Sequence, residues 1–196
     1  MSLPSDVEAW RAVTLWQPWA TLTALGVKTV ETRGRRCYWS GWTMIHAAKR
    51  RPSLDDMRVV VDNVDAWKAW RRAGLAPGGA VSCGPLGAVV AVARFTDCLP
   101  IVAEDDDLSH PEPVIEIRPS GVNRGLWLHP ADDDPADVDP EDVSDQLPYG
   151  NFRPGRFGLL LADVHPLVEP VAAKGQQAVP WRPSQGLVDA VLGQVR

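Results

Sequence analysis

Three charged residues of complementary chemistry stand close together near the N-terminus. Lys28, Glu31 and Arg33 fall within six residues of each other in the segment KTVETR. The two cations suit phosphate, while a carboxylate can read the edge of a base or act as a general base on water. Burial could also tune Lys28 towards base chemistry.

The β-branched residues of this segment predict a strand. It should follow a short helix whose C-terminal cap is Gly26. Alternation would place Glu31 and Arg33 on one face, with Lys28 on the other. A twist or bulge after Gly26 could still gather all three around one cleft. The alternative is a solvated strand with a surface ion pair, which usually contributes about 0 to 1 kcal/mol.

Aromatic and polar residues precede this segment in WQPWA. Unpaired bases stack on aromatic side chains in a basic groove, so Trp16 and Trp39 are candidate platforms and Gln17 a candidate reader of a base edge. Trp19 shares helical spacing with Leu22 and is expected in the core.

Other candidate ligand contacts are more scattered. His46 lies in an apolar strand and is either a buried structural histidine or a cleft residue. Lys49 follows the same strand, and Arg156 lies beside the turn signal Pro154-Gly155, where a phosphate contact and a solvated turn are both plausible readings.

The chain resembles the ASCH domain family, whose motif Gly-x-Lys-x-x-Glu-x-Arg corresponds to Gly26, Lys28, Glu31 and Arg33. The similarity continues through IHAAK, GAVVAVARFTDC, FRPGRFG and GQQAVPW, and so covers most of the chain outside its acidic stretch. This resemblance implies a fold of the PUA and EVE type: α+β, a PUA-like small mixed β-barrel with flanking helices. It also implies a cleft lined by the motif, and recognition of RNA or a modified nucleotide or nucleoside.

The predicted function is therefore binding of RNA or a modified nucleotide, with Trp16, Gln17, Lys28, Glu31, Arg33, His46, Lys49 and Arg156 as the ligand-binding residues. Some members of the family are ribonucleases or N4-acetylcytidine amidohydrolases, so the alternative is a hydrolase with Lys28 and Glu31 as catalytic residues. The small amidohydrolases have a catalytic threonine three residues after the motif lysine, where this chain has Glu31. Thr32 is adjacent but should point the opposite way.

Charge is distributed very unevenly along the 196 residues. The net charge is −5, but residues 104–145 hold 14 acidic and two basic side chains, a local charge of −12, which leaves +7 for the rest. We predict a single domain over residues 1–196 with an acidic, proline-rich insertion or lid at about 104–148. A second alternative function is a protein-interaction module that uses this acidic segment.

Hydrophobic periodicity predicts a mixed α+β chain with GAVVAVARFT as the strongest, central strand. We expect strands at 12–16, 28–33, 42–47, 87–96, 157–164 and 166–171, and helices at about 18–25, 53–72 and 183–195. The helix from Ser53 should present Leu54, Met57, Val61, Val64 and Trp67 on one apolar face.

Composition excludes several other classes of protein. No apolar run is long enough to span a bilayer, the first residues do not resemble a signal peptide, and the three cysteines form no CxxC pair. We therefore expect a cytoplasmic protein with reduced thiols and no membrane partner. The histidines and cysteines lack zinc spacing, so neither a metal nor another cofactor is expected. The oligomeric state remains open.

Overall fold

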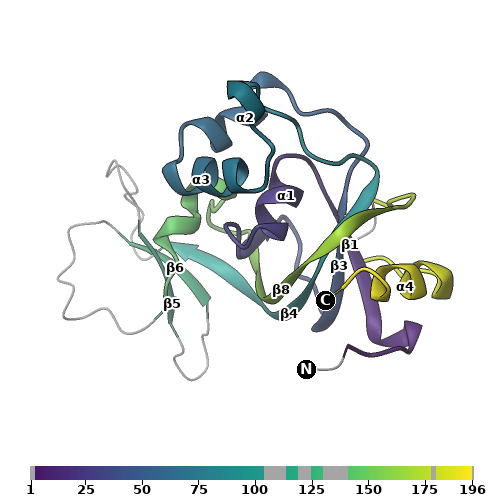
Figure 1. The fold of residues 1–196 in the computed structure, drawn as a ribbon. Coiled ribbons are helices and arrows are strands. Elements are labelled where there is room, and N and C mark those ends of the chain that lie inside the picture. The colour runs from purple at the N-terminus through teal and green to yellow at the C-terminus, as the bar shows by residue number, and fades with distance from the viewer. Residues whose placement is uncertain (1–2, 104–113, 119–124, 130–140, 178–179, 196) are drawn as a thin grey trace. The chain divides into compact units, whose positions relative to one another are not determined.

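The computed structural model describes residues 3–103, 114–118, 125–129, 141–177 and 180–195 (Figure 1). Most of the predicted acidic insertion at 104–148 lies outside these residues. The chain folds into two compact units, and each unit is built from separate stretches of the sequence. The first unit comprises Met1–Thr29, Trp39–Thr96 and Leu161–Arg196, and the second comprises Val30–Tyr38 and Asp97–Leu160.

The first unit is built on a mixed sheet whose strands begin close to the predicted positions. Strand β1 (Trp10–Leu15) pairs in parallel with β3 (Gly41–Ala47), and β3 pairs antiparallel with the first part of β4 (Ala88–Ala103). As predicted, β4 has neighbours on both sides, because β8 (Phe157–Ala172) also pairs with it. Strand β4 ends at Ala103 rather than 96, and β8 ends at Ala172 rather than 164. The segment 166–171 continues β8 rather than forming a strand of its own.

Helix α1 (Trp19–Ala24) follows β1 and ends in a Schellman motif. The Val27 amide donates to the Leu22 carbonyl and the Gly26 amide donates to that of Thr23. Gly26 has a φ of +73°, the left-handed conformation that glycine adopts without strain, so the predicted cap is confirmed.

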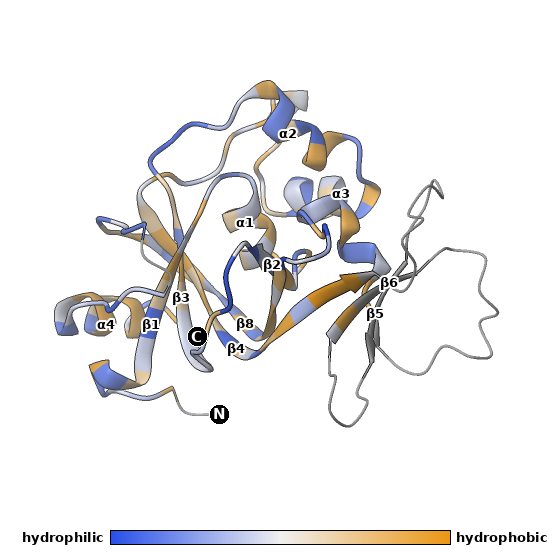
Figure 2. Ribbon diagram, turned by 180° about the vertical axis from the view of Figure 1, so that it is seen from behind, coloured by the Kyte–Doolittle hydropathy of each residue, from blue (hydrophilic) through white to orange (hydrophobic). Residues whose placement is uncertain are grey.

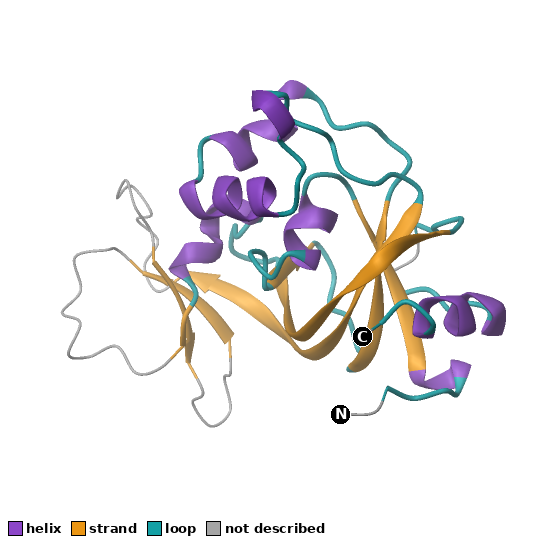
Figure 3. Cartoon of the chain, viewed as in Figure 1, coloured by secondary structure: helices purple, strands orange, loops and turns teal. Residues whose placement is uncertain are grey.

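The predicted long helix from Ser53 is wrong, because two helices occupy this segment: α2 (Leu54–Val61) and α3 (Val64–Arg72) (Figure 3). Asn63 starts the second helix, since its side chain accepts hydrogen bonds from the Asp65 and Ala66 amides, and the break resets the helical phase.

The predicted apolar face is consequently wrong as well. Leu54 is 89% exposed, whereas the buried residues of the two helices are Val60, Ala66, Ala69 and Trp70. Hydrophilic and hydrophobic segments alternate along both helices in Figure 2.

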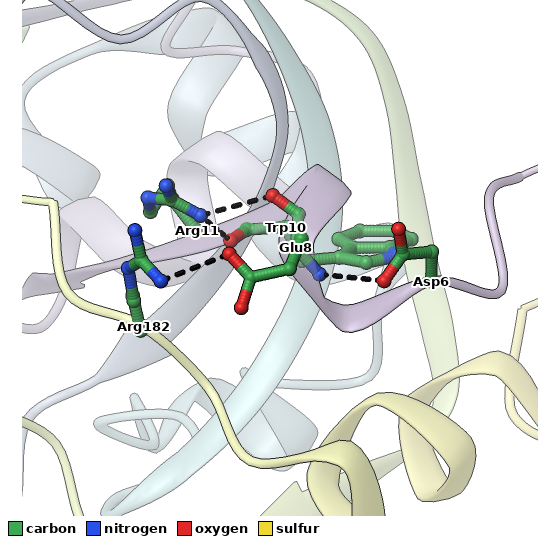
Figure 4. A network of polar contacts seen from close by, with 5 residues as sticks. All are labelled: Asp6, Glu8, Trp10, Arg11 and Arg182. Atoms are coloured by element: carbon green, nitrogen blue, oxygen red, sulfur yellow. Dashed lines mark hydrogen bonds and ion pairs between the residues drawn. The ribbon is translucent and has the colours of Figure 1, made fainter.

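The core of the first unit joins the sheet to helix α4 (Gln185–Leu192). Val188 and Val191 of α4 pack with Trp10, Met44 and Val89. At the N-terminal end of β1, Arg182 forms an ion pair with Glu8 at 2.9 Å, and Arg11 donates to the Glu8 and Trp10 carbonyls (Figure 4). The Arg182–Glu8 ion pair joins the segment before α4 to the start of the chain, whereas the bonds of Arg11 are local.

The second unit contains the remaining strand pairs and has its own small core. The end of β4 pairs in parallel with β6 (Gly125–His129), which pairs antiparallel with β5 (Val114–Arg118), and β5 pairs with β7 (Glu141–Asp142). Strand β2 (Val30–Arg33) pairs antiparallel with the start of β8. A small core gathers Val30, Leu99, Ile101, Leu126 and Phe152.

The coarse prediction of a mixed α+β fold is confirmed. Within the residues described, neither unit by itself closes its strands into a barrel. In the same part of the chain, every helix is too short or too polar to cross a membrane.

Candidate nucleic-acid interface

Two loops of the first unit leave its sheet at the same end. Because β1 and β3 are parallel, their carboxyl ends lie together, with Leu15 opposite Ala47. The Ala48 amide donates to the Leu15 carbonyl at 2.8 Å and extends this pairing by one step. Trp16 therefore emerges beside the basic run Lys49-Arg50-Arg51, although more than thirty residues separate them in the sequence.

Trp16 is an exposed aromatic residue with a cation over its ring. Its side chain is 55% exposed, and the Arg50 guanidinium lies 4.2 Å from the ring centroid. Arg50 also contacts Asp56 at 3.3 Å. The exposure of Trp16 is compatible with the predicted role as a stacking platform. Stacking of a base on it stays a prediction.

Asp56 positions Arg50 from the first turn of α2. Its carboxylate accepts from the Ser53 amide and the Ser53 hydroxyl accepts from the Asp56 amide, which together form a capping box. The hydrogen bond from the Ser53 amide is the main cause that lowers the pKa of Asp56. A charged carboxylate thus holds the guanidinium beside the indole at neutral pH.

Gln17 points into the protein, and its amide is used by the fold. It is fully buried, its Nε2 donates to Thr21 Oγ1 at 2.8 Å and to the Pro85 carbonyl at 2.7 Å, and its Oε1 accepts from the Thr21 amide at 3.1 Å. These bonds fix the turn from β1 into α1, and with it the place of Trp16.

His46 is also inside the first unit. Its Nε2 lies 3.1 Å from the Ala173 carbonyl, and its ring meets Trp181 edge-on at 6.1 Å between centroids. Burial lowers the pKa of His46, which favours the neutral imidazole. Gly175 packs against the ring so closely that a Cβ atom there would overlap it.

The remaining candidate residues of the first unit differ in their exposure to solvent. Lys49 is exposed, whereas Lys28 is only 1% exposed and has interactions inside the fold. Trp39 is half-buried: the Arg11 guanidinium lies 4.3 Å from its ring centroid, and its Nε1 donates to Thr43.

The other motif residues belong to the second unit, because the division between the units falls after Thr29. Glu31 and Arg33 share one face of β2 and form an ion pair at 2.9 Å, as the alternation predicts. Thr32 is buried on the opposite face, where its hydroxyl accepts from the Asn151 amide at 3.0 Å.

Arg156 is half-buried in the second unit and donates through Nε to the Asn151 carbonyl at 2.9 Å. It lies near a loop whose residues the sequence reasoning missed: Arg35, Arg36 and Tyr38 are all exposed. The signal was present as the basic and aromatic run GRRCY directly after the motif.

No group of three or more histidine, cysteine, aspartate or glutamate side chains within the described ranges could hold a metal ion. The chain matches no protein-family model, and no curated protein matches it. The similarity to the ASCH family therefore stays a prediction that rests on the motifs.

Proposed function

We propose that this protein binds RNA or a modified nucleotide, and that Trp16 is a stacking platform for one base. The observation that carries the proposal is the exposed indole with Arg50 held 4.2 Å above it. Membership of the ASCH family and a PUA-like barrel belong to the same proposal, and both rest on the motif residues Gly26, Lys28, Glu31 and Arg33.

Physical chemistry supports a nucleotide at this place. An exposed indole offers every base a flat apolar face, and each stacked base contributes about 1 to 3 kcal/mol. The neighbouring exposed cations Lys49, Arg50 and Arg51 suit phosphate. Trp10 and Trp70, by contrast, are fully buried in the core.

Fluorescence anisotropy with a labelled single-stranded 12-nucleotide RNA at low salt tests this proposal. We expect Trp16→Ala to weaken binding about 5- to 150-fold, the equivalent of 1 to 3 kcal/mol, and Trp16→Phe to retain part of the affinity. Leu54→Ala is the matched control, since Leu54 is an exposed apolar residue of the same unit. Equal affinities of Trp16→Ala and the unmodified protein would refute the stacking role.

Hydrolysis is the separate activity that the resemblance implies. Incubation with N4-acetylcytidine or single-stranded RNA, with Glu31→Gln as the control, detects it as product formation. Product formation by the unmodified protein that is lost in Glu31→Gln would show that the protein is a hydrolase as well as a binding protein.

A further inference from the structure

A basic loop of the second unit, Gly34–Tyr38, is anchored by one buried residue and otherwise faces solvent. Cys37 is buried, and its amide donates to Cys98 Sγ at 3.2 Å. Its neighbours Arg35, Arg36 and Tyr38 are exposed, and Tyr38 is 90% exposed. The Arg36 guanidinium lies 5.6 Å from the Tyr38 ring centroid.

A second basic turn, Asn151–Arg156, lies against this loop. The Asn151 amide donates to Thr32 at the end of β2, and a Cβ atom at Gly34 would lie 3.8 Å from Arg156 Nη1. The turn is held from the other side by Ile101, whose carbonyl accepts from the Gly155 amide and whose amide donates to the Arg156 carbonyl. Arg153, in the same turn, is exposed.

The two segments concentrate positive charge. Residues 31–38 and 150–156 contain five arginines and one acidic residue, Glu31, for a net charge of +4. Glu31 pairs with Arg33. Within the described part of the chain, the other four arginines form no ion pair, so their charge is available to an anion in solution.

We infer that this arginine–tyrosine surface, defined by Arg35, Arg36, Tyr38, Arg153 and Arg156, binds the backbone of single-stranded RNA. The inference rests on the proposed function and narrows its ligand from a nucleotide to a polynucleotide. Several guanidinium groups on two adjoining segments match successive phosphates better than the single phosphate of a mononucleotide.

The exposed ring of Tyr38 favours single-stranded RNA over the two other polyanions, an acidic protein segment and a nucleic-acid duplex. A side chain 90% exposed contributes little to packing, but its ring can stack on a base that is not already paired. An acidic protein segment offers charge without such a planar face, and a duplex hides its bases within the stack. Single-stranded RNA satisfies both the arginines and the aromatic ring.

The test uses the full chain and anisotropy with fluorescein-labelled U12, with UMP as the mononucleotide competitor. Arg35→Ala/Arg36→Ala should lower the magnitude of the slope of log K against log salt by about 1.4, the value for two phosphates of a single strand. Tyr38→Ala should weaken U12 binding about 5- to 150-fold, and Tyr38→Phe, which keeps the ring, should bind almost as the unmodified protein does. Arg71→Ala/Arg72→Ala, an exposed arginine pair of the first unit, is the matched control.

The outcomes separate this inference from the proposed function. Loss of U12 binding in Trp16→Ala, with no change in the surface variants, would overturn the inference and leave the proposed function. The reverse pattern would support the surface and remove the role of Trp16. No binding of U12 to the unmodified protein would overturn the inference together with the RNA part of the proposed function. Equal binding of a 12-residue polyglutamate, weakened by the same arginine and tyrosine variants, would overturn RNA in favour of an acidic protein segment.

Discussion

Replacing Gln17 discriminates between its two possible roles, reader of a ligand and support for a turn. The sequence placed Gln17 among the ligand contacts, but its amide makes three hydrogen bonds inside the first unit. One of them satisfies the Thr21 amide in the first turn of α1, which has no partner within the helix. Gln17→Ala would remove all three bonds and leave a space beside α1.

The magnitude follows from the groups left without partners. A buried polar group that loses its hydrogen bond costs about 1 to 3 kcal/mol, and both the Thr21 amide and the Pro85 carbonyl lose one. We expect Gln17→Ala to lower the free energy of unfolding by about 2 to 6 kcal/mol, the sum for the two groups. Gln17→Met keeps most of the volume, so it should retain only the part of the stability that comes from packing.

Urea unfolding followed by circular dichroism measures this effect. With an m-value of about 2 kcal/mol per M, the midpoint should fall by about 1 to 3 M. Trp16→Ala is the adjacent control and should cost less than about 1 kcal/mol, since its indole is mostly exposed. If Gln17→Ala unfolds at the unmodified midpoint but loses affinity for the 12-nucleotide RNA, then Gln17 reads the ligand and the structural explanation is wrong.

Two further predictions concern the buried histidine. Gly175→Ala would overlap the His46 ring and place a Cβ atom 2.8 Å from Thr14 Oγ1, so we expect a loss of about 1 to 3 kcal/mol in urea unfolding. Gly186→Ala in α4, where the added atom meets nothing within 4 Å, should not destabilise; equal midpoints for the two variants would contradict this packing. The pKa of His46 is lowered in the folded state, so the unfolded state binds more protons as pH falls below about 6.5. The free energy of unfolding should therefore decline below that pH by up to about 1.4 kcal/mol per pH unit until the folded-state pKa is passed. His46→Gln should lack this decline. An unchanged pH profile in that variant would show that His46 does not cause it.

Local patterns in the sequence were sufficient for several features of the fold. The two-residue period of a strand placed Glu31 and Arg33 on one face, and their ion pair confirms it. Gly26 was identified as a left-handed cap because few other residues tolerate a positive φ. In both cases the cause lies within a few residues of the effect.

The helical segment after Ser53 shows where local reasoning failed. The apolar residues fitted one continuous period, but the side chain of Asn63 starts a new helix and changes the phase. Leu54 then faces solvent while Val60 and Trp70 face the core. A helical period predicts a face only as long as the helix is unbroken.

The sequence by itself determined the chemistry that is available: the motif of Lys28, Glu31 and Arg33, the aromatic residues Trp16 and Trp39, and an acidic stretch of −12 in a chain whose other residues sum to +7. Only the tertiary structure decided which of these groups meet solvent. Parallel pairing of β1 and β3 brings Arg50 over Trp16, and the turn at Asn151 lies against Thr32 although more than a hundred residues separate them. Such contacts depend on strand pairing and burial across the whole chain, which no local period encodes.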